Sequence, residues 1–269
     1  MAALLRQFCW LFWLVTLTCS AEEQYGPSFD CKRAKLEIEQ DICSNDVLAR
    51  ADQFIHDCYQ TLLRQSGDKK SGDKNKLIAE QRAWLQSRNH FRDNSRNQRF
   101  FNNEEFIAGG YDEIIQLYDA FGSRIAELFD QLPPSQQRQL REHYLRQMGF
   151  QNPPSNPVAK WIDQQERNYA FENLANDCGR VTWDVLRNDR GLAVVMKTYS
   201  NQCGGTSWNS TSLEVYCINH NQLTQVDASP LNNEFEHVQA AQNPADQDDE
   251  QLFAFADRLS AKTLCEATK

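Results

Sequence analysis

The sequence predicts an α+β protein, in which a disulfide-stapled helical bundle is followed by a smaller domain that contains β-strands. Apolar residues recur at helical spacing through the first half, and β-branched and apolar residues form short runs in the second. Between them, residues 149–157 hold one glycine and three prolines, which interrupt helices. We therefore expect a signal peptide at 1–21, a helical domain at 22–150 and an α+β domain of unknown type at 151–269.

Composition excludes several classes of protein. The chain has 269 residues and a net charge of −9, which argues against a nucleic-acid-binding protein because such proteins need a concentrated basic face. Its longest apolar runs are shorter than the 18 or so residues of a membrane-spanning helix, which excludes a polytopic membrane protein. Hydrophobic residues make up 41%, too many for a disordered chain. A globular protein remains.

The first residues have the pattern of a secretory signal peptide. Arg6 precedes a short apolar run at residues 8–17, and small side chains follow at Cys19 to Ala21. We expect cleavage after Ala21, export to the periplasm or the medium, and no transmembrane segment afterwards. An uncleaved membrane anchor is one alternative. Lipoprotein processing at Cys19 is another, for which Thr16-Leu17-Thr18 is a poor match.

Export makes disulfides the expected state of the cysteines, because the chain then meets an oxidising compartment. No Cys-x-x-Cys pair exists and the histidines are scattered, so we expect no metal site and no cofactor. Because the number of cysteines after cleavage is odd, at least one is free or pairs outside the chain, and spacing does not give the pairing. The disulfide candidates are Cys31, Cys43, Cys58, Cys178, Cys203, Cys217 and Cys265.

Cys31 and Cys43 lie twelve residues apart around a short helical segment. We interpret them first as a staple, since a bridge of this loop size contributes ~3 kcal/mol in the chain-entropy model. A catalytic cysteine would need an activating base, which only the fold could supply, from His56 or His90.

The first half contains four predicted helices, at residues 45–65, 74–91, 111–132 and 135–148. The first follows Ser44 as N-cap, with Ala51, Ile55 and Tyr59 at helical spacing. A polar loop at residues 67–73 precedes the second helix. The prolines at 133 and 134 separate the third helix from the fourth.

The second half mixes helices and strands. Residues 161–176 and 246–261 are predicted to be helical, and the apolar run at 191–199 is predicted to be a strand. Residues 212–217 alternate apolar and polar side chains. With Asn219-His220-Asn221 as a turn, they form a predicted hairpin with residues 223–226.

A set of motifs in the first half resembles the N-terminal domain of LprI-type lysozyme inhibitors. Pro27 to Cys31, Ile42-Cys43-Ser44 and Gln81-Arg82-Ala83-Trp84-Leu85 occur in the order and spacing of that family. The resemblance covers residues 27–91 firmly and extends loosely to 130, through Tyr118 and residues 124–128. The motif residues are Asp30, Cys31, Cys43, Leu48, Asp52, Tyr59, Gln81, Trp84 and Arg88.

The resemblance implies a secreted or periplasmic helical domain, held by disulfides, that binds lysozyme and blocks it. One departure is clear: the family commonly has a cysteine a few residues after the position of Arg88, where this chain reads Asn89-His90-Phe91. The disulfide usually made there must be lost or rerouted, with Cys58 as the candidate for rerouting. Residues 151–269 resemble no family that we can name.

Other candidate sites have ordinary structural explanations. Trp84 and Arg88 share a helix face and could form a ligand platform, but we favour a core tryptophan shielded by the arginine stem. Arg92, Arg96 and Arg99 would extend a basic ridge if the helix continued, and a solvated edge is the simpler explanation. The acidic run at 246–250 lacks the ligand spacing of a calcium loop.

Common enzyme motifs are absent, and an inhibitor needs none. The sequence therefore predicts an exported binding protein, not an enzyme, that inhibits lysozyme by covering or filling its active-site cleft. The alternative is a non-inhibitory envelope protein whose C-terminal domain binds another protein or a cell-wall ligand. The sequence sets neither the oligomeric state nor the contact residues.

Overall fold

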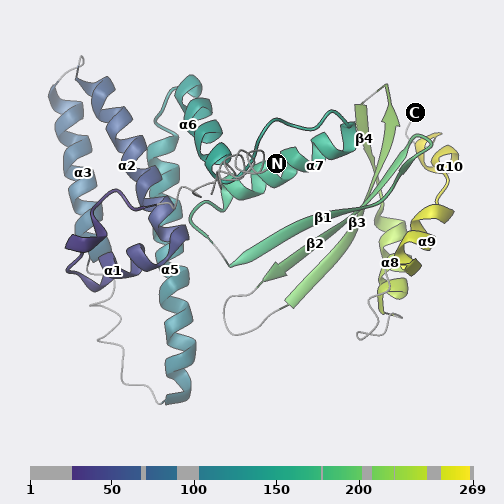
Figure 1. Cartoon of the computed structure of the whole chain (residues 1–269), viewed down its shortest axis with the longest axis horizontal. Helices are drawn as coiled ribbons and strands as arrows, with labels where there is room; N and C mark the ends of the chain where they lie inside the picture. Colours follow the sequence, from purple (N-terminus) through teal and green to yellow (C-terminus); the bar gives the residue numbers. More distant parts are fainter. Residues whose placement is uncertain are drawn as a thin grey trace, which may run out of the picture.

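The computed structural model describes residues 26–67, 71–89, 103–176, 178–201, 208–220, 222–240 and 250–266. Helices dominate the first half and an antiparallel sheet lies in the second (Figure 1), which confirms the predicted α+β class and the stapled helical region. The predicted signal peptide lies outside the described residues. No helix in the described ranges is long and apolar enough to cross a membrane.

The helical half is built around one central helix, α2. Its apolar side chains recur at helical spacing, and eight of its residues are buried against the neighbouring helices. Asn45 caps it by accepting a hydrogen bond from the Leu48 amide at 3.0 Å, one residue later than the predicted cap at Ser44. The elements are η1 (Cys31–Arg33), α1 (Glu37–Ser44), α2 (Asp46–Ser66), α3 (Ser71–Asn89), α5 (Asn103–Phe129) and α6 (Pro134–Gln147).

Helix α6 begins at Pro134, one residue before the predicted start, because proline fits the first helical position, where no amide donor is needed. Helix α7 (Pro157–Glu172) uses the same device, with Asn156 accepting from the amides of Val158 and Ala159. The proline-rich segment before residue 157 thus leads directly into a helix that starts four residues before the predicted position 161.

The sheet is a four-stranded antiparallel meander in the order β1-β2-β3-β4. Its strands are β1 (Gly179–Asp189), β2 (Leu192–Asn201), β3 (Trp208–Asn219) and β4 (Gln222–Val226). The predicted strand at 191–199 corresponds to β2, and the predicted hairpin to β3 and β4. Strand β1 was not predicted, because polar residues interrupt its apolar ones.

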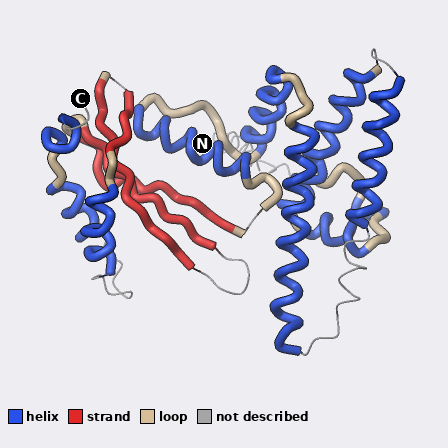
Figure 2. The backbone as a smooth tube through the Cα atoms, turned by 180° about the vertical axis from the view of Figure 1, so that it is seen from behind, coloured by secondary structure: helices blue, strands red, loops and turns tan. Residues whose placement is uncertain are grey.

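Helices cover both faces of the sheet. Leu192 and Val194 of β2 face α8 (Ser229–Ala240) and α9 (Glu250–Arg258), whereas Ala193 and Val195 lie in a cluster with Val158 and half-buried Trp161 of α7. Strand β2 is therefore buried on both sides, which explains its unbroken apolar run. The short helix α10 (Ala261–Glu266) ends the described chain, and Figure 2 shows the sheet from behind.

A β-bulge between Val185 and Arg187 places both Leu186 and Arg187 in the interior. The Arg187 guanidinium donates to the carbonyls of Ala256, Asp257 and Leu259, at 3.2, 3.3 and 2.6 Å. It thereby satisfies carbonyls at the C-terminal end of α9. Its positive charge also interacts favourably with the negative end of that helix's dipole.

Helix α7 is shared between the two halves of the molecule (Figures 1 and 2). Its first turns pack on the sheet through Val158, whereas Phe171 and the following Leu174 pack into the helical core. The Phe171 ring lies 5.7 Å from Phe54 and 5.3 Å from Phe129, measured between ring centroids. The division predicted at residue 150 stays a prediction, and a helical unit cut there would lose part of its core.

We therefore expect a fragment of residues 22–150 to be less stable than one of residues 22–176. The shorter fragment lacks Leu174 and Phe171, so the part of the core that they cover becomes exposed. Burial of the Leu174 side chain alone contributes about 1.5–3 kcal/mol. Urea unfolding of both fragments, which contain the same cysteines, measures the difference. Leu174→Ala in the whole chain should cost about 2–5 kcal/mol. Equal unfolding midpoints for the two fragments would contradict this role of α7.

Candidate functional site

The motif residues of the first half converge on a buried ion pair between α2 and α3. Arg88 Nη1 donates to Asp52 Oδ1 at 2.9 Å, and the two side chains are only 7% and 4% exposed. The second carboxylate oxygen accepts from the Ser28 amide at 2.9 Å and from its hydroxyl at 2.6 Å. One carboxylate therefore ties the segment before η1, the central helix and α3 together.

The rest of the Arg88 guanidinium is also satisfied. Its Nε and Nη2 atoms donate to Asn89 Oδ1, and its Cζ atom lies 5.6 Å from the centre of the Trp84 ring. Burial lowers the pKa of Arg88, and the charges of Asp52 and Glu39 oppose that shift. The arginine stays charged because its usual pKa is far above neutrality.

Glu39 caps the start of α1, since its carboxylate accepts from the amides of Lys35 and Leu36. These hydrogen bonds lower the pKa of Glu39. Its negative charge also lies near Arg88, so the cap of α1 and the buried ion pair reinforce each other electrostatically.

Trp84 is half-buried and packs against the core rather than forming an open platform. Its ring packs edge-on against Phe121 with centroids 5.4 Å apart, and the buried Arg88 covers it from one side. Gln81, one turn earlier on α3, is buried as well and accepts from Nε and Nη2 of Arg124 on α5. The favoured interpretation of Trp84, a core residue shielded by arginine, agrees with this geometry.

The remaining motif residues are also structural in position. Leu48 is fully buried, Tyr59 is half-buried against the same core, and Asp30 caps η1 by accepting from the Lys32 amide. The motif thus specifies how the helices meet. If this half of the molecule binds a partner, exposed side chains make the contacts, and most of the motif residues are not among them.

Two disulfides are formed among the described residues, Cys31–Cys43 and Cys217–Cys265. The first joins η1 to α1 as the proposed staple, and the second fastens α10 to β3. Cys178 is disulfide-bonded too, and Cys203 lies outside the described residues.

The suggestion that Cys58 takes part in a rerouted disulfide is wrong. Cys58 is a free thiol on α2, completely buried in the helical core, and the described cysteines have other partners. Burial raises its pKa to about 12, with a smaller contribution from the charge of Asp57. It is therefore an apolar core side chain and a poor nucleophile at neutral pH.

The stapled segment, residues 31–44 from η1 through α1, carries exposed side chains next to the buried ion pair. Lys32, Arg33 and Lys35 are exposed, and Leu36 is 43% exposed, one of few large apolar side chains so open in the described chain. The Cys31–Cys43 bridge and the Glu39 cap hold this segment in place. Spacing alone gave no sign that Leu36 would face solvent.

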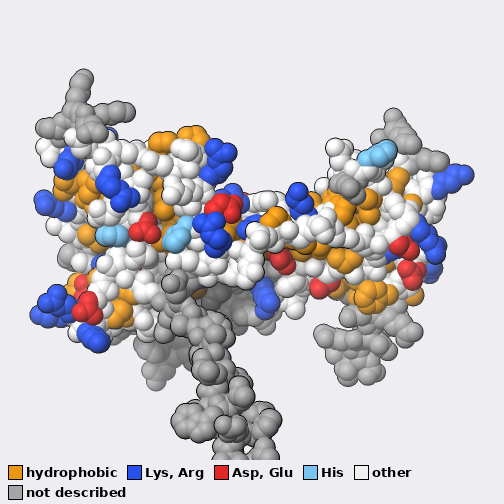
Figure 3. Space-filling model, turned by 45° about the horizontal axis from the view of Figure 1, so that its top comes forward, with side chains coloured by type: hydrophobic (Ala, Val, Ile, Leu, Met, Phe, Trp, Pro, Cys, Tyr) orange, Lys and Arg blue, Asp and Glu red, His pale blue; other side chains and the backbone are white. Residues whose placement is uncertain are grey.

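The described residues include no group of three or more His, Cys, Asp or Glu side chains that could hold a metal ion. The acidic residues 246–249 and the arginines at 92, 96 and 99 lie outside the described residues. On the face seen in Figure 3, acidic and basic side chains are interspersed along the molecule rather than gathered by sign.

The family model described as "Lysozyme inhibitor LprI" matches residues 31–128. This match confirms the resemblance seen in the motifs, and it includes the looser part that reaches α5. No curated protein and no solved structure matches the chain. Residues 31–128 are therefore similar to the LprI family.

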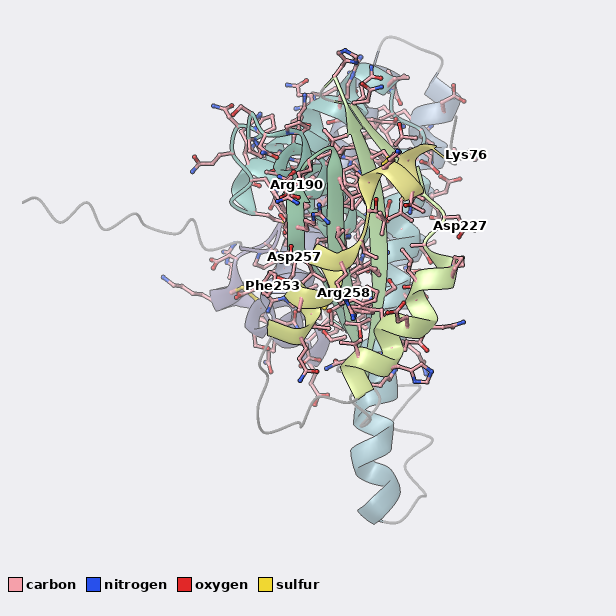
Figure 4. The ribbon with its side chains drawn as sticks, turned by 90° about the vertical axis from the view of Figure 1, so that its right-hand side faces the viewer. Lys76, Arg190, Asp227, Phe253, Asp257 and Arg258 are labelled. Atoms are coloured by element: carbon pink, nitrogen blue, oxygen red, sulfur yellow. A yellow bond between two sulfur atoms is a disulfide. The ribbon has the colours of Figure 1, made fainter. Side chains whose placement is uncertain are left out.

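We expect Arg88→Met to destabilise the protein by about 3–5 kcal/mol, because it leaves the Asp52 carboxylate buried without its charged partner. Adding Asp52→Asn should recover part of that loss, since the uncompensated charge disappears. Arg190→Met is the control: Arg190 is 83% exposed in the β1–β2 turn (Figure 4), and we expect less than about 0.5 kcal/mol. Urea unfolding measures the unchanged protein, both single variants of the pair, the double variant and the control, and strictly additive losses of Arg88→Met and Asp52→Asn would refute the coupling.

We also expect Cys58 to resist iodoacetamide in the native protein and to react once the chain is unfolded in denaturant. Mass spectrometry of the peptide that contains Cys58 measures the extent of labelling. The unfolded thiol loses its proton near pH 9 whereas the folded thiol keeps it to about pH 12. The unfolded state thus binds fewer protons in that window, so stability falls as pH rises. Cys58→Ala should reduce this fall relative to the unchanged protein. Rapid native labelling would contradict the burial.

Proposed function

We propose that this chain is an exported binding protein that inhibits a lysozyme by covering or filling its active-site cleft. The observation that carries the proposal is the match of residues 31–128 to the lysozyme-inhibitor family model. Such a protein acts by occupying a cleft and needs a rigid surface, not catalytic residues. We accordingly propose that it is not an enzyme.

We assign the contact to the exposed side chains of the stapled segment, residues 31–44, rather than to the buried motif residues. Its disulfide and its glutamate cap limit its motion, so little conformational entropy is lost when a partner binds. Leu36 offers an apolar side chain at the surface, and because it is 43% exposed, its complete burial by a partner would contribute about 1 kcal/mol.

The charges around Leu36 support a cleft as the partner surface. Lys32, Arg33 and Lys35 place three cations on this exposed segment. Glycoside hydrolases such as lysozyme carry a pair of carboxyl groups at the scissile bond. Glu37, Glu39 and Asp41 balance these cations over residues 31–44, so only the basic end at residues 32–35 is electrostatically complementary to such a cleft. The net charge of −9 of the whole chain favours encounter with basic lysozymes.

The alternative is an envelope protein without inhibitory activity, whose second half binds another protein or a cell-wall ligand. One observation favours this alternative. Asp52, Gln81 and Arg88 are buried, so residues that define the motif also define the packing of the helices. The family match would then report the fold of the first half alone.

A cell-wall lysis assay separates the two. The oxidised chain without its predicted signal peptide is titrated against lysozymes of several types, and we expect stoichiometric inhibition of at least one. Leu36→Asp should weaken inhibition about tenfold or more, because it replaces the proposed apolar contact with a carboxylate that faces the carboxyl groups of the cleft. Phe253→Asp is the matched control: Phe253 on α9 is also 43% exposed but lies in the second half (Figure 4).

Two results would count against this function. If the folded chain inhibits no lysozyme, the inhibitor proposal fails and the alternative gains. If Leu36→Asp and Phe253→Asp weaken inhibition equally, the inhibitor proposal stands but its assignment to residues 31–44 fails. Circular dichroism of each variant confirms that the helices are retained.

A further inference from the structure

A groove lies where α6, the start of α7 and strand β4 approach one another. Its volume is about 530 Å³, and it is lined by side chains of all three elements and of the proline-rich segment before α7. That volume is within the range of small-ligand sites, roughly 300–1,000 Å³. None of the motif residues of the first half lines it.

One wall of the groove is an aromatic ring held from behind. Trp161 of α7 is half-buried, and its ring packs against Tyr216 of β3 with centroids 4.6 Å apart. Pro153, Pro157 and Leu223 add apolar surface to the lining. Because Asn156 caps α7 just before this ring, the turn that carries Trp161 is fixed at its start.

The polar side of the groove is organised by one buried arginine. Arg167 Nε donates to Asp163 Oδ2 at 2.7 Å, Nη1 lies 4.0 Å from Glu142 Oε2, and Nη2 donates to the carbonyl of Gln151. Its guanidinium also lies 5.2 Å from the centre of the Phe150 ring. Arg167 therefore holds carboxylates from two helices, α6 and α7, at the edge of the same groove.

The lining carries no net charge. Two carboxylates, Glu142 and Asp163, are balanced by two cations, Lys160 and Arg167, and the amide of Gln164 adds a neutral polar group. A cationic ligand would meet Lys160 and Arg167, and an anionic ligand would meet the carboxylates. Such a lining suits a neutral ligand that has many hydroxyl groups to donate and accept hydrogen bonds.

We propose that this groove binds a neutral saccharide chain. The flat apolar face of a sugar ring stacks on Trp161, whose aromatic surface matches it in size and in being apolar on its face. Hydroxyl groups donate to the carboxylates of Glu142 and Asp163, and Lys160 and Gln164 donate to ring and hydroxyl oxygens. The site does not depend on the proposed inhibition of lysozyme, since none of the residues that line it belongs to residues 31–128 or to the stapled segment.

Calorimetric titration of the whole chain tests this with three neutral probes: cellotriose, chitotriose and maltotriose. We expect at least one to bind with an affinity in the low-millimolar range or better, and Trp161→Ala to weaken it about tenfold. Trp208→Ala is the matched control, since Trp208 on β3 is 48% exposed and does not line the groove.

Because Trp161 also packs on the sheet, a second variant protects the test against unfolding. Gln164 is exposed on α7, so Gln164→Ala leaves the packing intact and should weaken binding several-fold. Failure of all three saccharides to bind would overturn the proposal. So would binding that both groove variants leave unchanged. The Leu36→Asp variant should bind saccharide normally, so loss of inhibition and loss of saccharide binding can be told apart.

Discussion

The ion pair between Asp52 and Arg88 is the interaction on which the helical half depends. It joins residues 36 positions apart, and through Ser28 it also fixes the segment that leads into the first disulfide. A buried ion pair adds little net stability compared with apolar packing. Removing one of its two partners is costly, however, because the other charge is left buried without compensation. Its effect is therefore to fix one arrangement of η1, α2 and α3. The position of residues 31–36 depends on that arrangement.

Much of the fold follows from sequence pattern, and the differences have physical causes. The apolar run of β2 predicts a strand because both its faces are covered, and alternation in β3 predicts the hairpin with β4. Strand β1 was not predicted because polar residues interrupt its apolar ones, and its bulge between Val185 and Arg187 also breaks the alternation. Helix α8 was not predicted either, because Phe235 is its main buried side chain and one such residue gives only a weak periodic pattern.

The candidate site was less predictable than the fold. The motif residues could be named from the sequence, but not that Arg88 would be buried, because its partner lies on another helix. The groove could not be predicted for the same reason. Its lining residues Glu142, Trp161 and Leu223 come from three elements, and only the fold brings them together. The prolines at residues 153–157 suggested only an interruption between two domains, yet Pro157 starts the helix that forms the groove wall.

The second disulfide has a consequence for how this protein responds to proteolysis. Cys217 and Cys265 enclose β4, α8 and α9, and the bridge closes a loop of 48 residues. A single peptide bond cut anywhere inside that loop leaves both pieces in one covalent molecule, so the mass of the protein under oxidising conditions rises only by one water. The helices that cover one face of the sheet then remain next to it, and refolding after such a cut stays unimolecular until the bridge is reduced.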